Sequence, residues 1–346
     1  MIRDARLAPF GPAATVCLLP HFTAGHGEIR TLGGRIVCVD SAAASLAAYL
    51  LAETRLHALP LDDRAVRTAF DRLRAENLVA ILPAVSEPAS RRIETLILSP
   101  HVDDAALSVS LQLVARCGQG RRLVCNIFSD QSYQTGLRVP APTLRTVARA
   151  EDRLAGRILD YERCDLGLAG AQDRHGLSLG RTLGWNRDRV RAEPALAQEV
   201  RDLADRLATL LADAACRDAA ILAPAGIGGH LDHVLVALAG RELLAAGVLK
   251  AEHLTFYEDL PYAAATSRPL DMGKTRRIAA DGNALALKLA ALAVFRTRLR
   301  AAQIAVCAAR AMALGGGGRP AELTFAAWPA DGQAMDSGRL VGSMAQ

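Results

Sequence analysis

From about residue 94 onward, short apolar runs alternate with longer amphipathic runs, and this alternation constrains the fold more than any other feature of the chain. The runs with the character of β-strands are residues 95–99, 122–129, 164–168, 219–223 and 254–257. The runs with apolar residues at helical spacing are residues 105–115, 144–158, 195–215, 234–246 and 284–311. Because strands that alternate with helices pair in parallel through crossover connections, we predict an α/β fold around a mostly parallel sheet.

The first 92 residues show a different pattern of expected strands and helices. Short strands are expected over residues 14–19 and 35–39, and helices over residues 42–51 and 63–76. Pro83 and Pro88 then bracket a partly polar stretch, which is typical of a domain boundary. We therefore predict a small α+β N-terminal domain over residues 1–92 and a larger domain over residues 93–346.

The composition excludes several classes of protein. Apolar residues make up 51% of the 346 residues and charged residues 22%, which is typical of a globular chain. The net charge of +5 is spread over interleaved basic and acidic residues, and only 4% of the residues are aromatic, so nucleic acid is not an expected partner. No apolar run reaches the length of about 18 residues that a membrane helix needs. The seven cysteines are odd in number and contain no C-x-x-C pair, which argues against a disulfide framework. These features predict a cytoplasmic protein without a membrane partner, and they leave the oligomeric state open.

A first cluster of polar residues lies where a predicted strand ends and a helix begins. The strand over residues 95–99 is followed by Pro100, His101, Val102, Asp103 and Asp104. His101 and Asp104 are three residues apart across this turn, so an imidazole and a carboxylate can converge on one cation. Asp103 points in another direction and can accept a proton from a metal-bound water. The alternative is structural, because acidic residues in a first helical turn are favoured by the helix dipole alone.

A second cluster occupies the same kind of position further along the chain. Gly228, Gly229, His230, Leu231, Asp232 and His233 follow a predicted strand and precede a helix. Ligands bind at such strand ends in parallel sheets. If His233 supplies a third ligand, two imidazoles and one carboxylate hold the ion and leave positions open for water and substrate. Open positions are typical of a catalytic rather than a structural zinc site.

Four segments, in this order, resemble motifs of the PIG-L (LmbE-like) zinc-dependent N-deacetylases. They are SPHVDDAALS at residues 99–108, RAEDR at 149–153, GIGGHLDH at 226–233 and FYEDLPY at 256–262. The resemblance covers about residues 94–328. It implies a Rossmann-like fold with helices on both sheet faces, and a Zn²⁺ ion bound by His101, Asp104 and His233. It also implies that Asp103 is the general base, and that His230 stabilises the tetrahedral intermediate or protonates the leaving amine.

The reaction implied by the resemblance is removal of an acetyl or similar acyl group from an amine. The expected substrate is an acyl-amino sugar, a glycosylated natural product or a modified peptide. Relatives often carry a Leu-Pro-Asp segment whose carboxylate helps hold a sugar, but this chain has Leu168, Ala169 and Gly170 there. Nearby Asp173 or Arg174 could replace that carboxylate. The candidate substrate-binding residues, including two from the matched motifs, are therefore Arg149, Asp173, Arg174 and Tyr257.

The N-terminal region lies outside this resemblance. Residues 33–40, the helix after them and residues 66–79 are weakly similar to the small PqqD-like winged domains that bind leader peptides. The region is expected either to present a substrate or to be a structural appendage, which packs on the catalytic domain or mediates dimerisation.

Two other functions use the same residues. His101 and Asp103 with a distant histidine also form the pattern of a non-haem Fe(II) oxygenase, but that facial triad normally sits on a barrel-like double sheet. A binding module that keeps the metal without turnover is the other alternative. Loss of Asp103 would have favoured such a module, and Asp103 is present.

Overall fold

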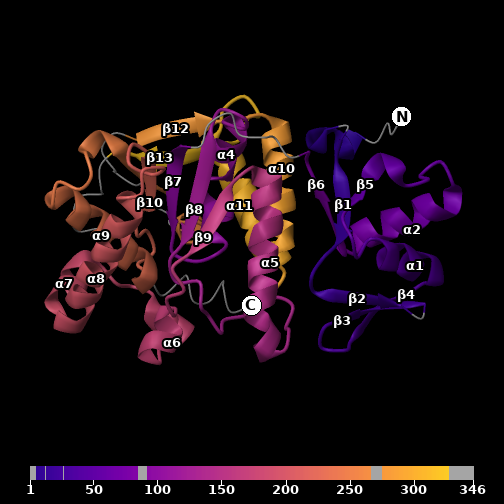
Figure 1. Ribbon diagram of the computed structural model, residues 1–346, viewed down its shortest axis with the longest axis horizontal. Helices are drawn as coiled ribbons and strands as arrows, with labels where there is room; N and C mark the ends of the chain where they lie inside the picture. Colours follow the sequence, from indigo (N-terminus) through magenta and orange to yellow (C-terminus); the bar gives the residue numbers. More distant parts are fainter. Residues whose placement is uncertain (1–4, 12, 26, 85–91, 266–274, 327–346) are drawn as a thin grey trace. The chain divides into compact units, whose positions relative to one another are not determined.

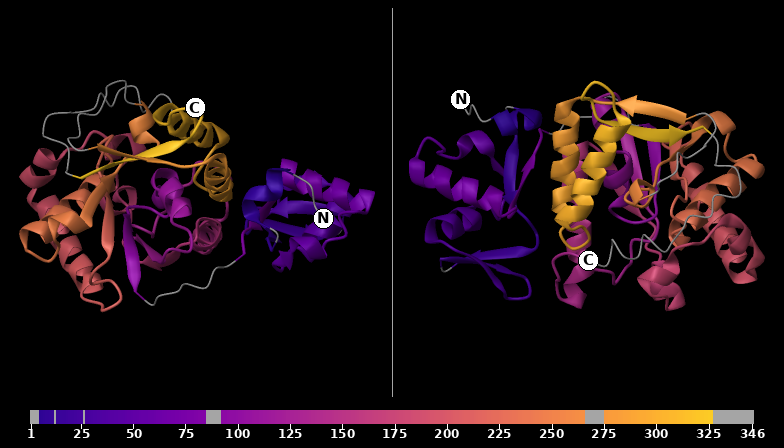
Figure 2. Two further views of the ribbon diagram at one scale, coloured as in Figure 1. Left: turned by 90° about the horizontal axis from the view of Figure 1, so that it is seen from above. Right: turned by 180° about the vertical axis from the view of Figure 1, so that it is seen from behind.

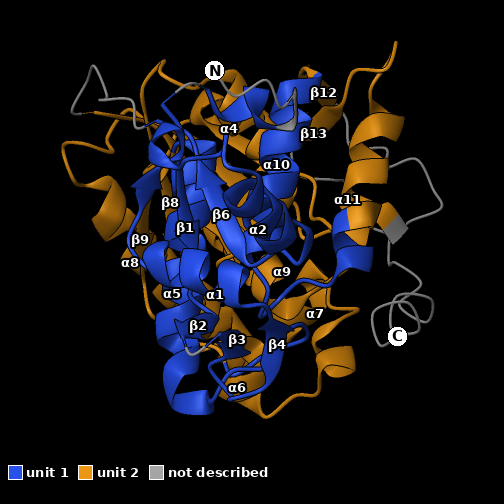
Figure 3. Cartoon of the chain, turned by 90° about the vertical axis from the view of Figure 1, so that its right-hand side faces the viewer, with its two compact units in different colours: residues 1–86, 132–160, 282–304 blue, residues 87–131, 161–281, 305–346 orange. Residues whose placement is uncertain are grey.

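The computed structural model describes residues 5–11, 13–25, 27–84, 92–265 and 275–326. The chain forms two compact units, each built from segments that are distant in sequence (Figure 3). Unit 1 contains residues 1–86, 132–160 and 282–304, and unit 2 contains residues 87–131, 161–281 and 305–346. Pro88 and most of the stretch before the predicted boundary lie outside the described residues, so the division at residue 92 stays a prediction.

The N-terminal part of unit 1 contains two small antiparallel sheets and two helices (Figure 1). One sheet has the order β5-β1-β6, with β5 at Thr54–Arg55, β1 at Thr15–Leu18 and β6 at Val79–Leu82. The other consists of β2 (Phe22–Gly25), β3 (Glu28–Thr31) and β4 (Ile36–Val39). Helices α1 (Ser41–Tyr49) and α2 (Arg64–Ala75) begin where the carboxylates of Asp40 and Asp63 accept hydrogen bonds from backbone N–H groups of the first turn. The two predicted strands, which are β1 and β4, and the two predicted helices are confirmed, whereas β2, β3, β5 and β6 were not predicted.

Unit 1 also contains α5 (Ala141–Leu159) and α10 (Gly282–Val294). The prediction of one helix over residues 284–311 is wrong, because α10 ends at Val294 and α11 (Ala301–Leu314) begins only after a loop. The buried carboxylate of Glu151 explains the break. It accepts hydrogen bonds from the backbone N (2.8 Å) and from Oγ1 (2.6 Å) of Thr297, which lies in the loop.

Unit 2 is built on a seven-stranded sheet of order β12-β13-β11-β10-β7-β8-β9 (Figure 2). The five parallel strands are β7 (Ile93–Ser99), β8 (Arg121–Asn126), β9 (Glu162–Asp165), β10 (Ala220–Pro224) and β11 (Leu254–Tyr257). Strands β12 (Thr275–Ala279) and β13 (Ala321–Phe325) extend one edge in antiparallel pairing. The centre of β7 is completely buried, as expected for a strand covered on both faces. The predicted α/β fold class with a mostly parallel sheet is confirmed.

Helices connect and flank these strands. They are α3 (Asp104–Ser108), α4 (Ser110–Ala115), α6 (Ala171–His175), α7 (Arg187–Ala192), α8 (Pro194–Leu211) and α9 (Leu231–Ala245). Helix α9 packs on β10, and α8 packs on α9. The predicted helix over residues 105–115 is divided at Val109, because buried Glu322 accepts hydrogen bonds from the backbone N–H groups of Leu111 and Gln112. Strands β7 and β10, which are neighbours, thus lead directly to α3 and α9. None of the described helices has the length and apolar character that a membrane crossing requires.

Candidate metal centre

The two predicted clusters lie at the same edge of the unit 2 sheet. Strand β7 ends at Ser99 before α3, and β10 ends at Pro224 before α9. These strands pair in parallel, so both turns lie at their carboxyl ends. The turn before α9 depends on glycine, since Gly228 has a φ of +89° and a Cβ there would lie 2.4 Å from the Cβ of Tyr262.

Three side chains from these turns converge. Oδ2 of Asp104 lies 3.2 Å from Nδ1 of His101 and 3.3 Å from Nε2 of His233, and all three side chains are buried. Among the residues that the structure describes, the groups able to hold a metal ion are His101, His230 and His233, and His101, Asp103 and Asp104. In each group the potential ligand atoms lie within 4.8 Å of one another. The structure therefore brings together all five residues that the two clusters contributed to the predicted site.

Two further carboxylates orient the histidines. Nε2 of His101 lies 3.0 Å from Oδ2 of Asp232, and Nδ1 of His233 lies 2.7 Å from Oδ1 of Asp259. A ring nitrogen that donates to a carboxylate leaves the lone pair on the opposite nitrogen, which here faces Asp104 in both histidines. Nε2 of His233 is buried and lacks a hydrogen-bond partner of suitable geometry within the described ranges. A buried, unpartnered acceptor of this kind fits a position opposite a cation.

Asp232 and Asp259 were not predicted as functional residues from the sequence. Both were visible in the matched motifs, at the third position of HLDH and the fourth position of FYEDLPY. The signal that could have found them is chemical, because a histidine that binds a metal usually donates its other ring nitrogen to a carboxylate or carbonyl. Tyr262 was also missed, and its ring centroid lies 5.8 Å from that of His230 and 5.4 Å from that of His233.

Burial and charge separate the protonation behaviour of these groups. Burial and, to a smaller extent, the neighbouring His101 lower the pKa of His230 to about 3, so His230 is neutral near pH 7. Burial alone would also lower the pKa of His233, but the carboxylates of Asp104 and Asp259 outweigh it and raise the pKa to about 10. Burial would raise the pKa of Asp104, yet His233 and His101 hold it below its ordinary value. The cluster thus attracts positive charge, which a metal ion would supply while displacing the proton of His233.

The remaining predicted residues have different surroundings. Tyr257 is completely buried, and its hydroxyl donates to the carbonyl of Leu98 at 2.9 Å. Asp173 is exposed on α6, and Arg174 on the same helix is half-buried. Arg149 lies on α5, which belongs to unit 1. Roles in substrate binding stay predictions for all four.

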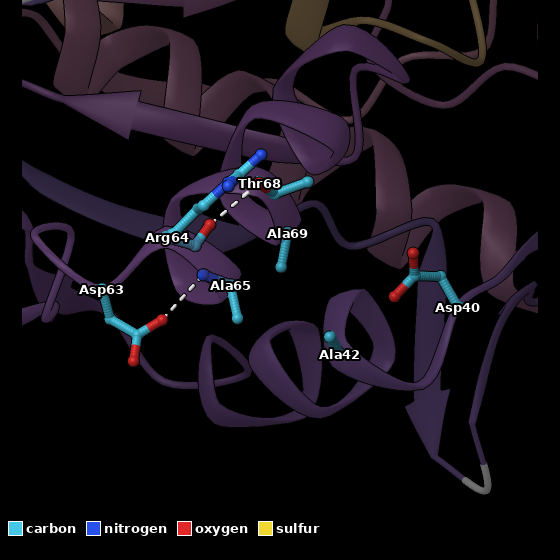
Figure 4. A pocket seen from close by; sticks show the side chains of 7 residues that line it. All are labelled: Asp40, Ala42, Asp63, Arg64, Ala65, Thr68 and Ala69. Atoms are coloured by element: carbon cyan, nitrogen blue, oxygen red, sulfur yellow. Dashed lines mark hydrogen bonds between the residues drawn. The ribbon is translucent and has the colours of Figure 1, made fainter.

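A separate hollow lies in unit 1 (Figure 4). Its lining residues are Asp40, Ala42, Asp63, Arg64, Ala65, Thr68 and Ala69. Asp63 accepts a hydrogen bond from the backbone N of Ala65 at 2.7 Å, and Asp40 accepts one from the backbone N of Ala43 at 2.8 Å. Helix capping therefore accounts for both carboxylates of this hollow.

The fold and the site define an α/β protein with a buried histidine–carboxylate cluster, a candidate metal centre, at the carboxyl ends of its parallel strands. No protein-family model matches the chain. Over 183 residues, half of its length, the chain is 33% identical to the 2'-N-acetylparomamine deacetylase of Streptomyces fradiae, and the match spans 59% of that protein.

Solved structures resemble the chain in fold. The A40926 pseudoaglycone deacetylase Dbv21 has a TM-score of 0.50 and 21% identity, covering 69% of this chain and 97% of its own. A deacetylase of teicoplanin biosynthesis, solved with teicoplanin, has a TM-score of 0.51 and 19% identity, covering 68% of this chain and 97% of its own. The predicted resemblance to the PIG-L (LmbE-like) deacetylases is thus confirmed, in sequence over half of the chain and in fold over about two thirds of it.

Proposed function

We propose that this chain is a metal-dependent hydrolase that removes an acetyl or similar acyl group from an amine. The observation that carries the proposal is the convergence of His101 Nδ1, Asp104 Oδ2 and His233 Nε2, with a second carboxylate behind each histidine. Two imidazoles and one carboxylate are a ligand set typical of catalytic zinc, so Zn²⁺ is the ion we propose. When bound, such an ion polarises the acyl carbonyl and lowers the pKa of a bound water.

The remaining groups of the site divide the proton chemistry. Asp103 is half-buried and adjacent to the ligand Asp104, so its carboxylate can take the proton of the attacking water and pass it to the departing amine. His230 is neutral near pH 7 and carries one N–H group, which suits it to donate a hydrogen bond to the acyl oxygen as negative charge develops there. Of the two roles predicted for His230, its low pKa favours stabilisation of the oxyanion over donation of a proton.

We propose an N-acetylated amino sugar as the substrate class. The support is the sequence similarity to a deacetylase named for its substrate, 2'-N-acetylparomamine. A glycosylated natural product and a modified peptide are the other substrates predicted from the sequence, and a substrate panel separates the three.

The two alternative functions are less well supported. By analogy of fold, the facial triad of the oxygenase alternative normally sits on a barrel-like double sheet, whereas the candidate metal centre lies on a mostly parallel sheet with crossover helices. A binding module without turnover has no need of a carboxylate placed like Asp103, which is part of a candidate metal group.

The test is acetate release by zinc-loaded protein from 2'-N-acetylparomamine, N-acetylglucosamine and an N-acetylated peptide. The proposal expects acetate from an amino sugar, loss of activity after chelation, and recovery on addition of Zn²⁺. Tight binding of the amino sugar without acetate release would support the binding module. Turnover that needs Fe(II) and O₂ would support the oxygenase.

A further inference from the structure

Arg174 is held by the protein around its whole guanidinium group. Nη2 lies 2.9 Å from Oδ1 of Asp232, and Nε donates to Oε2 of Glu199 at 3.0 Å. Nη1 donates to the carbonyl of Ala169, and Cζ lies 4.4 Å from the ring centroid of Phe128. An arginine with this many protein partners has little capacity left for a substrate.

Asp232 connects Arg174 to the candidate metal centre. Its Oδ1 accepts a hydrogen bond from Nη2 of Arg174. Its Oδ2 accepts hydrogen bonds from Nε2 of His101 (3.0 Å) and from the backbone N of Ala171 (2.9 Å). The Asp232 side chain is only 1% exposed, so these protein partners, rather than water, compensate its charge. Glu199, Arg174, Asp232 and His101 therefore form a continuous chain of hydrogen bonds that ends at a proposed metal ligand.

We propose that Arg174 is a positioning residue for the metal centre, acting on His101 through Asp232. This inference rests on the proposed function of the site. Arg174 fixes one carboxylate oxygen of Asp232, which leaves the other directed at Nε2 of His101. The proton of His101 then stays on Nε2, and Nδ1 keeps its lone pair toward Asp104 and His233.

The geometry requires arginine rather than any cation. The planar guanidinium reaches Asp232 and Glu199 through different nitrogens and stacks on Phe128 at the same time. A lysine ammonium could retain the charge near Asp232, but it could not reach Asp232 and Glu199 through separate nitrogens of one planar group, and it would lose the stacking contact with the Phe128 ring. The inference therefore predicts graded effects for Arg174→Lys and Arg174→Gln.

The experiment measures the zinc dissociation constant by competition with a chromophoric chelator. The proteins are the full-length wild type, Arg174→Lys, Arg174→Gln and a control, Arg189→Gln. Arg189 is a suitable control because it also stacks on an aromatic ring, Trp185 (3.6 Å), in the same unit. The absorption spectrum of the Co²⁺-substituted protein reports the ligand geometry independently of activity.

We expect Arg174→Gln to weaken zinc binding by about 10- to 100-fold and to change the Co²⁺ spectrum. Arg174→Lys should lie between this variant and the wild type, and Arg189→Gln should match the wild type. Because Arg174 acts through Asp232, the double variant Arg174→Gln/Asp232→Asn should bind zinc as weakly as Asp232→Asn alone. If Arg174→Gln fails to fold, the zinc affinity and the Co²⁺ spectrum of Arg174→Lys, compared with those of the wild type, test the inference.

Unchanged zinc affinity and spectrum in folded Arg174 variants would overturn the inference. A raised KM with normal metal binding would instead support the predicted contact with substrate. Failure of the proposed function can be distinguished from failure of this inference. A wild type that binds zinc but releases no acetate would contradict the proposed function, yet the zinc affinities of the variants could still be compared. A wild type without zinc affinity would overturn both.

Discussion

At the scale of single residues, neighbours in sequence have separate tasks at this site. Asp104 is buried between two histidines, whereas Asp103 is only half-buried, although both lie in the same turn. His230 and His233 lie within one helical turn, yet the pKa of His230 is lowered and that of His233 is raised. Burial lowers the pKa of both histidines, but the carboxylates of Asp104 and Asp259 outweigh it at His233, whereas the neighbouring His101 adds to it at His230.

The first prediction concerns Asp103. Asp103→Asn keeps the shape of the side chain but removes the proton acceptor, so zinc content should stay near that of the wild type. Acetate release should fall by about 10²-fold or more, as expected for loss of a general base. Metal analysis and acetate assays on the same preparations check both parts. If Asp103→Asn loses as much zinc as Asp104→Asn does, the two carboxylates have been assigned the wrong roles.

A second prediction concerns metal binding itself. His233→Ala removes one proposed ligand and leaves the carboxylates of Asp104 and Asp259 facing an empty volume, so the purified variant should contain little zinc. The control is His57→Ala, since His57 is exposed in unit 1. Elemental analysis after dialysis measures both. Full zinc occupancy in His233→Ala would remove this residue from the ligand set.

At the scale of helices and strands, periodicity predicted most elements of the larger sheet, because buried parallel strands are continuous apolar runs. The run at residues 254–257 coincides with β11. Periodicity failed where a hydrogen bond to a residue distant in sequence determines where a helix begins or ends. The end of α10 depends on Glu151 binding Thr297, and the start of α4 depends on Glu322. The carboxylates behind the histidines were missed for the same reason, since Asp259 meets His233 only in the folded chain.

One ion pair links α5 to the N-terminal segment inside unit 1. Glu53 accepts two hydrogen bonds from Arg157 (2.9 and 2.8 Å) and one from Oγ1 of Thr15. Hydrogen bonding to Arg157 lowers the pKa of Glu53 below its ordinary value, against the opposing effect of burial. The pair is about one third exposed, so solvent screening limits its contribution to stability.

The third prediction is the pH dependence of this ion pair. Because the pKa of Glu53 is lower in the folded state, its stabilisation is present above the unfolded pKa of about 4.3 and is lost as the pH falls through the folded value. Glu53→Gln should therefore lower the free energy of unfolding by up to about 1 kcal/mol at pH 7. The difference should shrink below about pH 4.3. Urea unfolding at several pH values measures it, and a difference that grows with acidity would contradict the assignment.

At the scale of the whole molecule, unit 1 is assembled from three separate stretches of chain. Nε2 of His21 and Oε1 of Glu151 form a completely buried hydrogen bond at 2.7 Å, although 130 residues separate them. Val139, Leu144 and Val147 form a small buried cluster against which Leu32 packs. The residues of the predicted N-terminal domain are therefore part of the core that α5 needs.

The last prediction tests whether residues 93–346 can fold alone. Removing residues 1–92 would leave the carboxylate of Glu151 without His21 and expose the apolar cluster that Leu32 covers. Leaving a buried acceptor without its hydrogen-bond partner costs about 1–3 kcal/mol, a sizeable part of the stability of an ordinary domain. We expect the truncated protein to aggregate or to melt well below the full chain, as judged by size-exclusion chromatography and thermal unfolding. A monodisperse truncated protein with the wild-type melting temperature and normal zinc content would show instead that residues 1–92 are an independent domain. The substrate-presenting role expected for that region would then be the one to test, by comparing a small N-acetyl compound with a larger substrate.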